Sequence, residues 1–286
     1  MTDLVSIVVP VYNAGRVIGE TIDSVLKQSH TGWELILVDD GSTDESVSVI
    51  EEYRRRADAG SGLTDAANAA AGAGSGLTDV ANATADVSGK APSCRIRLIK
   101  NTGEHGACHA RNKGTEQAEG RYLCFLDADD LWDREKLSKQ LSFMRKTGAA
   151  FSFTGYEFAD ENGKGTGKIV KVPPQITYEE ALKNTTIFTS TVMFDLSLLG
   201  RETVRMPAIE SEDTACWWRI LRGGVTAYGL NESLTLYRRS AGTLSSNKNT
   251  AIRRIWRLYR EAEGLSVIKS AYCFVFWAVR AVLRRI

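Results

Sequence analysis

Residues 5–13 read VSIVVPVYN and residues 33–44 read WELILVDDGSTD, and these two segments decide the fold. Each contains an apolar run, Val5 to Val9 and Leu35 to Val38, of the kind that forms a strand buried on both faces. Between them, residues 15–28 place their apolar side chains at helical spacing. The two segments therefore predict a strand–helix–strand unit in which each strand ends in polar residues.

The same alternation continues along the chain. Further helices are expected from a capping box at residues 42–45 through Arg56 and over residues 107–118 and 134–145, and further strands over residues 96–99 and 122–126. This order predicts an α/β, Rossmann-like domain with a mostly parallel sheet and helices on both faces. Ligands of such sheets bind beyond the carboxyl ends of the strands, where Asp39-Asp40 and the acidic residues 127–130 fall.

Composition excludes several classes of protein. The chain has 286 residues, a net charge of +1 and 43% hydrophobic residues, which are globular values and do not suit a protein that coats nucleic acid. Five scattered cysteines without a C-x-x-C pair indicate free thiols in a reducing cytosol. The first residues do not resemble a signal peptide. His105 and His109 are four residues apart, but without an H-E-x-x-H context they are expected on a solvated loop or helix face.

Residues 57–93 differ from the rest of the chain. They are rich in alanine, lack aromatic residues and contain a repeat, GSGLTDAANA from Gly60 and GSGLTDVANA from Gly74. Such a segment buries too little apolar surface to offset its ordering entropy. We expect residues 1–249 to form one domain interrupted by a flexible surface insertion at 57–93, followed by a tail over residues 250–286.

Asp127 and Asp129 form a D-x-D pair just after an expected strand. Side chains two residues apart lie on one side of an extended backbone, so the two carboxylates point into the same crevice. Their joint charge favours a cation between them, and hard oxygen ligands suit Mg²⁺ or Mn²⁺, of which Mg²⁺ also binds phosphate oxygens. A solvated acidic loop is the alternative for the pair taken alone.

Together these motifs resemble a known family. VSIVVPVYN, WELILVDDGSTD, GACHARNKG and LDADD, in this order, are similar to family 2 glycosyltransferases with the GT-A fold. The resemblance covers nearly the whole chain apart from residues 57–93. It implies inverting, metal-dependent transfer of a hexose or N-acetylhexosamine from a nucleotide-diphosphate sugar, with UDP as the expected nucleotide.

The resemblance also implies roles for individual residues. Pro10 and Tyr12 match the end of the family's first strand, which packs on the base. Asp40 matches the acid that accepts a hydrogen bond from the base, and Arg111 matches an arginine near the nucleotide. Asp127 and Asp129 match the metal-binding pair, with Asp129 as the more direct ligand.

The acidic pair Glu212-Asp213 matches the family's pair before a helix, which implies that Asp213 is the general base. A helix N-cap in front of buried Trp217 and Trp218 is the structural alternative for Asp213. Ser240 stands where the resemblance predicts a metal-binding His, so a third protein ligand is not expected. Arg238 or Arg239 is instead a candidate clamp for the diphosphate, with an exposed salt bridge as the alternative.

The tail combines eight basic residues with ten uncharged residues, 270–279, a stretch too short to span a bilayer. It predicts an amphipathic helix on an anionic membrane surface, and a helix packed on the core or on a second subunit is the alternative. The tail resembles that of enzymes that build O-antigen, capsule or teichuronic-type polymers. It implies a polyprenyl-diphosphate-linked glycan acceptor and a cytoplasmic location, peripheral on the inner face of the cell membrane.

Two other functions compete with this interpretation. FLDADDLW also resembles the nucleophile strand of a haloacid-dehalogenase-type phosphatase, but Tyr12 and Asp40 would then have no role. A non-catalytic protein that binds nucleotide sugars or glycans could keep the same fold. It would not need carboxylates at the metal-binding and general-base positions, and this sequence has them. Dinucleotide and P-loop enzymes are disfavoured because their glycine motifs are missing.

Overall fold

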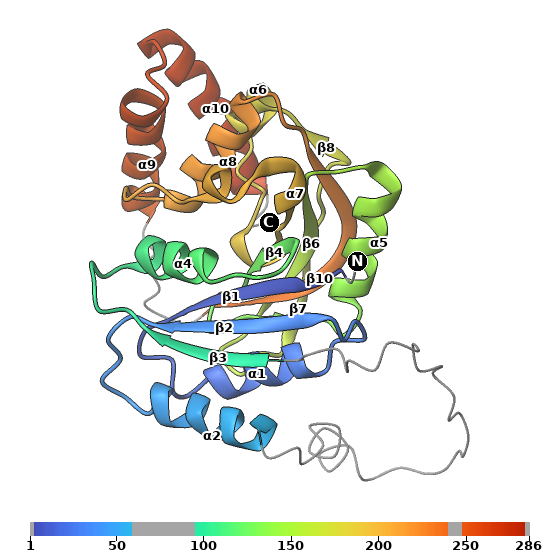
Figure 1. Ribbon diagram of the computed structural model, residues 1–286. Coiled ribbons are helices and arrows are strands. Elements are labelled where there is room, and N and C mark those ends of the chain that lie inside the picture. Colours follow the sequence, from blue (N-terminus) through green and yellow to red (C-terminus); the bar gives the residue numbers. More distant parts are fainter. Residues whose placement is uncertain (1–2, 59–94, 240–247, 284–286) are drawn as a thin grey trace.

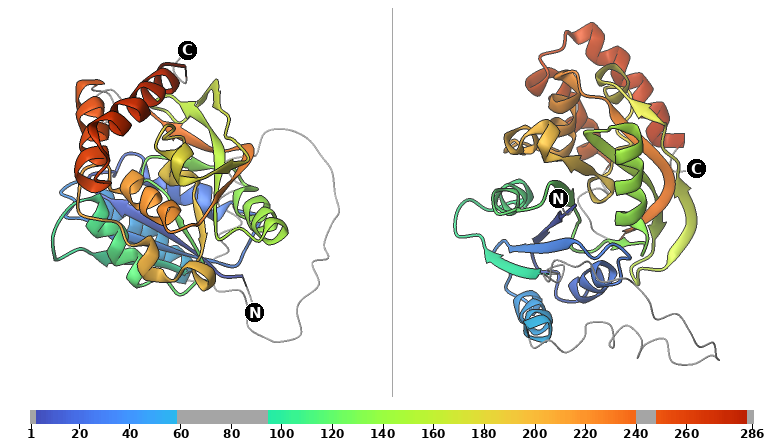
Figure 2. Two further views of the ribbon diagram at one scale, coloured as in Figure 1. Left: turned by 90° about the horizontal axis from the view of Figure 1, so that it is seen from above. Right: turned by 45° about the vertical axis from the view of Figure 1, so that its right-hand side comes forward.

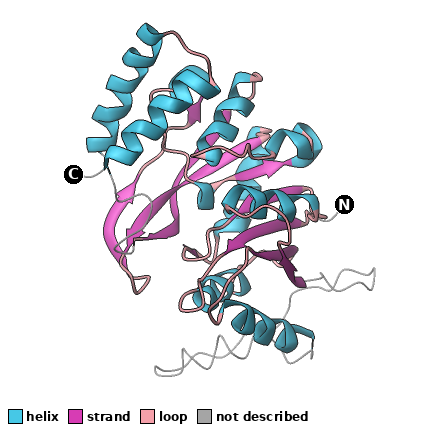
Figure 3. Ribbon diagram, turned by 90° about the vertical axis from the view of Figure 1, so that its left-hand side faces the viewer, coloured by secondary structure: helices cyan, strands magenta, loops and turns pink. Residues whose placement is uncertain are grey.

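A computed structural model describes residues 3–58, 95–239 and 248–283 (Figure 1). A ten-stranded sheet runs through the molecule in the order β3-β2-β1-β4-β9-β6-β10-β5, with β7 paired to β6 and β8 to β10. Helices cover both faces of the sheet (Figure 3). The α/β architecture expected from the alternation of apolar runs is therefore confirmed.

The first half of the sheet is parallel. β1 (Val5–Val11) lies between β2 (Trp33–Asp39) and β4 (Tyr122–Phe125), and β3 (Arg95–Lys100) forms the edge beside β2. Successive side chains of a strand point to opposite faces. Ile7 and Val9 accordingly pack in one core with α1, and Val8 packs in the other with α4. Burial on both faces explains why these strands read as uninterrupted apolar runs.

Three helices belong to this half: α1 (Ile18–Leu26), α2 (Ser46–Asp58) and α4 (Ala107–Glu116). The next helix, α5 (Lys136–Thr147), packs on β6 and β10 of the second half. The two helices α1 and α2 lie below β1 and β2, and α4 lies above them (Figure 1). All four were expected, with ends that differ by a few residues. Residues 59–93 of the expected insertion, with its repeat, lie outside the described residues, and α2 covers the first two residues of that insertion.

The expected capping box at the start of α2 is wrong in its detail. The helix begins at Ser46, and the backbone N–H of Ser46 donates to Asp44 Oδ1 at 3.0 Å. Asp44 Oδ2 accepts from Gly15 N at 2.8 Å, while Ser42 Oγ accepts from Asn13 N at 3.1 Å. The polar residues of GSTD therefore cap the helix and also hold the loop that follows β1.

The second half of the sheet is mixed, which the expectation of a mostly parallel sheet did not foresee. β9 (Met193–Asp195) is antiparallel to both β4 and β6 (Phe151–Ala159), whereas β10 (Ala227–Arg238) is parallel to β6. The remaining strands are β5 (Leu131–Trp132), β7 (Gly165–Val170) and β8 (Gln175–Ile176), all antiparallel to their partners. The short helices of this half are α6 (Tyr178–Ala181), α7 (Leu196–Leu199), η1 (Thr189–Thr191) and η2 (Arg201–Val204), and the longer α8 spans Glu212–Arg222.

The tail folds as α9 (Lys248–Arg257), a π-helical turn η3 (Leu258–Ala262) and α10 (Val267–Leu283). These elements lie at the end of the molecule opposite α1 and α2 (Figure 2). Leu258, Tyr259 and Cys273 are buried in the core, so the tail packs on the domain through one side. Among the described residues, no helix is long and apolar enough to cross a membrane. The four cysteines within the described ranges are buried and free.

Lys136, at the start of α5, is fully buried. Its Nζ donates to Gln140 Oε1 at 2.6 Å and lies 4.2 Å from the centre of the Trp132 ring. No carboxylate is paired with Lys136 among the described residues, and burial lowers the pKa of Lys136 to about 8. The folded state therefore binds this proton less tightly than the unfolded chain.

This difference predicts a pH-dependent stability. Between the folded and unfolded pKa values, the unfolded chain carries more protons, so stability rises with pH through this window. Relative to a K136M variant, the wild-type free energy of unfolding should increase by about 1–2 kcal/mol between pH 7.5 and 9.5, as measured by urea denaturation. K139M, on the exposed side of the same helix, is the matched control: it keeps Lys136, so the difference in free energy of unfolding between wild type and K139M should show no such increase.

Candidate active site

A cavity of about 1010 Å³ lies beyond the carboxyl ends of β1, β2 and β4. It gathers six of the eight residues that the sequence singled out, and Asp213 and Arg238 are outside its lining. The predicted residues that line it are Pro10, Tyr12, Asp40, Arg111, Asp127 and Asp129. The strands expected at this edge of the sheet therefore bring the separate motifs into one place.

Asp40 stands at the end of β2 and is held by the protein on both carboxylate oxygens. Asn101 Nδ2 donates to Oδ1 at 2.6 Å, and the backbone N–H of Gly106 donates to Oδ2 at 2.6 Å. His105 Nδ1 lies 3.0 Å from the Asp40 carbonyl oxygen. Next to Asp40, Gly41 adopts φ +89°, a turn conformation that a side chain would strain.

The loop from Asn101 to Gly106 was not expected in the site. It follows β3, so its position at the carboxyl end of a parallel strand was the signal that could have identified it. Tyr12, by contrast, was expected there. Its side chain is 64% exposed and stands at the mouth of the cavity with an unshielded ring.

Three carboxylates, Asp127, Asp129 and Asp130, crowd the loop after β4. Burial, together with the charge of Asp127, raises the pKa of Asp129 to about 6. Asp130 is fully buried and accepts hydrogen bonds from Ser190 Oγ at 2.5 Å and Arg238 N at 3.1 Å. Burial and the two neighbouring carboxylates raise the pKa of Asp130 well above its usual range. Within the described ranges, no group of three or more His, Cys, Asp or Glu side chains could hold a metal ion, so Asp127 and Asp129 remain the candidate pair.

Arg238 lies behind this loop and not in the cavity. Its side chain is 2% exposed, with Nε donating to the Asp129 carbonyl oxygen at 2.8 Å and a guanidinium N–H donating to Glu20 Oε2 at 2.6 Å. Each of its three side-chain nitrogens donates to the protein, so Arg238 is placed to position the acidic loop. The expectation that Arg238 clamps the diphosphate and its alternative, an exposed salt bridge, both differ from this buried arrangement. Ser240 lies outside the described residues.

Arg111, on α4, joins the acidic loop to α8. One terminal N–H group donates to Asp127 Oδ1 and the other to Glu212 Oε1, both at 2.7 Å. Burial alone would lower the pKa of Arg111, but Asp127 and Glu212 outweigh it and raise that pKa. Burial raises the pKa of Glu212, and Arg111 opposes that rise. Glu212 was not expected as a partner of Arg111, because the bond joins two residues far apart in the sequence.

Asp213 follows Glu212 in the first turn of α8. Its Oδ2 accepts from Thr189 Oγ1 at 3.0 Å, and its Oδ1 accepts from the backbone N–H of Thr214 at 2.6 Å. The residue that precedes the helix is Ser211, which adopts φ +58°, so the expected alternative of an Asp213 N-cap is wrong. Trp217 and Trp218 are buried behind it, as expected.

Comparison with known proteins agrees with this geometry, which is that of an α/β enzyme binding a ligand at its strand ends. The family model "Glycosyl transferase family 2" matches residues 6–84 and 74–202. The chain belongs to this family and is a glycosyltransferase. The phosphatase alternative is thereby excluded.

Two relatives cover most of the chain. A protein of Bacillus subtilis named as the teichuronic acid biosynthesis glycosyltransferase TuaG is 39% identical over 99% of this chain and 98% of its own length. The Escherichia coli UDP-Glc:alpha-D-GlcNAc-diphosphoundecaprenol beta-1,3-glucosyltransferase WfgD is 33% identical over 88% of this chain and 84% of its own.

Solved structures share the fold at low sequence identity. S. aureus TarS 1–349 in complex with UDP-GlcNAc has a TM-score of 0.62 at 19% identity, covering 96% of this chain and 70% of TarS 1–349. The mannosyltransferase PcManGT from Pyrobaculum calidifontis, in complex with GDP-Man and Mn²⁺, has a TM-score of 0.63 at 17% identity, covering 95% and 68%. The GT-A fold expected from the motifs is therefore confirmed.

The Arg111 bridge predicts a large loss of stability on its removal. R111M leaves two partly buried carboxylates facing each other without their cation, which should lower the free energy of unfolding by about 3–5 kcal/mol in urea denaturation. R205M removes an exposed ion pair with Glu116 on the same helix α4 and should cost less than about 1 kcal/mol. Equal costs for the two variants would contradict a buried, coupled bridge.

Proposed function

We propose that this glycosyltransferase moves a hexose or N-acetylhexosamine from a UDP-sugar to a hydroxyl of a lipid-linked glycan, with inversion, in the synthesis of a bacterial surface polysaccharide. One observation carries the proposal. The cavity that gathers Tyr12, Asp40, Asp127 and Asp129 is joined through Arg111 to the helix that bears Asp213. Donor and base are thus held by one connected set of side chains.

The donor nucleotide would lie between the ends of β1 and β2. The exposed ring of Tyr12 offers a face for the base, and Pro10 lines the same wall. Asp40 accepts hydrogen bonds through two oxygens that have lone pairs to spare, so it can also accept from the N3–H of uracil.

The acidic loop fits a divalent cation. Asp127 and Asp129 supply hard oxygen ligands. Burial, and then the charge of Asp127, raises the pKa of Asp129, and a cation bound between the two carboxylates would offset both effects. When bound, Mn²⁺ or Mg²⁺ would neutralise the charge on the departing diphosphate. Ser190 and Arg238 hold Asp130 and the backbone of Asp129, and so keep the loop in place.

Asp213 would act as the general base. Its carboxylate would take the proton of the acceptor hydroxyl as that oxygen attacks the anomeric carbon and the bond to the diphosphate breaks. One displacement inverts the anomeric centre. Hydrogen bonds from Thr189 and Thr214 orient the carboxylate for this step.

The relatives support the acceptor class and the cellular setting. TuaG is named for teichuronic acid biosynthesis, and the named acceptor of WfgD is a sugar linked through a diphosphate to undecaprenol. A lipid-linked acceptor of this kind requires an enzyme that works at a membrane surface. We therefore place this enzyme in the cytoplasm, peripheral on the inner face of the cell membrane.

Helix α10 offers a surface for that contact. One side packs on the domain through Cys273, and Phe274 and Trp277 are partly buried beside it. The other side exposes apolar residues at helical spacing: Val267, Ile268, Tyr272, Val275, Phe276 and Val279. The expected alternative of packing on the core therefore holds for one side of α10, and we propose the other side for contact with the membrane.

Donor binding is testable by thermal shift. UDP should raise the Tm of the wild-type protein more in the presence of Mn²⁺ than in EDTA, because the ion links the carboxylates to the diphosphate. D129N should lose the Mn²⁺-dependent part of the shift. A wild-type shift that is indifferent to Mn²⁺ would contradict the metal site.

The base is tested separately by transfer. D213N should keep the UDP-dependent thermal shift and lose about 10²–10⁴-fold in transfer rate, measured with a panel of UDP- and GDP-sugars and Mn²⁺. E210Q, an exposed acid on the same segment, is the matched control and should transfer normally. Full activity in D213N would exclude it as the base, and inactivity of the wild type towards every donor would favour the non-catalytic alternative.

Membrane contact is tested by flotation with anionic liposomes. I268E and V275E should each release the protein from the vesicles, because a carboxylate would then face apolar lipid and anionic headgroups. I169E, at another exposed apolar position, on β7, should float as the wild type does. Point variants are preferred to truncation before Leu265, which would remove core residues such as Cys273. Unchanged flotation of both α10 variants would refute the membrane role.

A further inference from the structure

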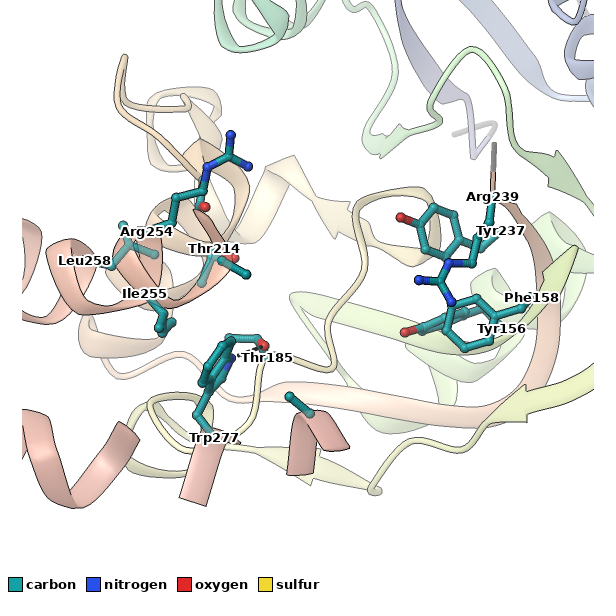
Figure 4. Close-up of a pocket in the computed structure, with 13 residues that line it drawn as sticks. Tyr156, Phe158, Thr185, Thr214, Tyr237, Arg239, Arg254, Ile255, Leu258 and Trp277 are labelled. Atoms are coloured by element: carbon teal, nitrogen blue, oxygen red, sulfur yellow. Dashed lines mark hydrogen bonds between the residues drawn. The ribbon is translucent and has the colours of Figure 1, made fainter. Parts of the chain in front are cut away.

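A second cavity, of about 310 Å³, lies between the aromatic side chains of β6 and β10 and the helices α9 and α10 (Figure 4). It shares no lining residue with the donor cavity. Ser211 and Thr214, which flank the Glu212–Asp213 pair, both line it. The cavity therefore borders the first turn of α8, which bears the proposed base.

Two contacts show how the base connects the cavities. Phe188 packs against Tyr237 of the second cavity at 4.3 Å between ring centres, with the rings tilted by 41°. The next residue, Thr189, donates to Asp213. In the other direction, Glu212 pairs with Arg111 of the donor cavity. The acidic pair of α8 thus stands between the two cavities, where a hydroxyl from one could reach a sugar in the other.

The second cavity is positively charged. Among the described residues that line it, the charged ones are Arg239, at the end of β10, and Arg254, on α9. The Arg254 Nε is buried and has no hydrogen-bond partner within the described ranges. A buried donor without a partner is costly, and an anion with several acceptor oxygens would satisfy it.

The remaining walls are aromatic on one side and apolar on the other. Tyr156, Phe158 and Tyr237 gather with Arg239, whose guanidinium carbon lies 4.9 Å from the Phe158 ring centre (Figure 4). Across the cavity, Ile255 and Leu258 accompany Arg254, and Trp277 comes from α10. Trp277 belongs to the helix that carries the exposed apolar side chains, but it lies on the side of that helix that faces the domain.

We propose that this cavity binds the diphosphate of an isoprenoid-linked sugar acceptor, with Arg239 and Arg254 as its ligands. This inference rests on the proposed function and adds a site to it. The sugar would lie towards Asp213, the diphosphate between the two arginines, and the isoprenoid chain along Ile255, Leu258 and Trp277. The chemical order of the walls matches the order of groups in such an acceptor.

The test uses farnesyl diphosphate, an isoprenoid diphosphate that requires no knowledge of the acceptor sugar. The full-length protein is first saturated with UDP and Mn²⁺, and binding is measured by isothermal titration. Farnesyl diphosphate should bind, while farnesol and inorganic pyrophosphate should each bind at least about tenfold more weakly. R239Q and R254Q should each weaken binding of farnesyl diphosphate by about tenfold or more. R253Q, which removes the same charge from the next position of α9 outside this cavity, should bind as the wild type does.

Several results would overturn the inference. These are competition of UDP with farnesyl diphosphate, equal affinity for inorganic pyrophosphate, and unchanged affinity in both R239Q and R254Q. Thermal shift with UDP shows that each variant is folded and has an intact donor cavity. The proposed function is tested by UDP binding and sugar transfer, and the second cavity by farnesyl diphosphate, so that the two can fail separately.

Discussion

The site depends on one buried guanidinium. Arg111 has lost its water and is balanced by Asp127 on one side and Glu212 on the other. A buried charge is tolerated only when it is paired and hydrogen-bonded, so removing either carboxylate leaves the arginine insufficiently compensated. Asp127 follows a strand of the parallel half of the sheet, and Glu212 begins a helix of the mixed half. The bridge therefore fixes the distance between the loop for the donor and the helix for the base.

The acidic loop after β4 also contains buried charges that need compensation. Asp129 and Asp130 lie close to Asp127, and burial makes their charges more costly still. Ser190 and the backbone of Arg238 stabilise Asp130, while the Arg238 side chain holds the backbone of Asp129. These contacts compensate only part of the negative charge of the loop, and we propose that a divalent cation supplies the rest.

The parallel half of the fold was predictable because its strands are buried on both faces and read as apolar runs. The mixed half was not, because β5, β8 and β9 have two or three residues, too few for a period to emerge. Tyr12, Asp40 and Asp127 were identified from motifs that stand at strand ends. Asn101 and His105 were missed as partners of Asp40, since their role depends on the pairing of β3 with β2. Arg238 was predicted to bind the diphosphate, but it lies behind the loop after β4. This position depends on the packing of the end of β10 against that loop.

In the tail, the local sequence pattern predicted a helix but not how that helix packs. The spacing of its apolar and basic residues indicated a helix with an apolar side. Helix α10 has apolar residues on two sides, however, and the sequence does not say which side the domain covers. By itself, the sequence determined the order of strands and helices, the acidic strand ends and the family, because these depend on short-range pattern. The tertiary structure decided which charges meet, that Arg111 joins Asp127 to Glu212 and that Arg254 faces a second cavity. Such contacts join residues distant in the chain, and only packing brings them within hydrogen-bonding distance.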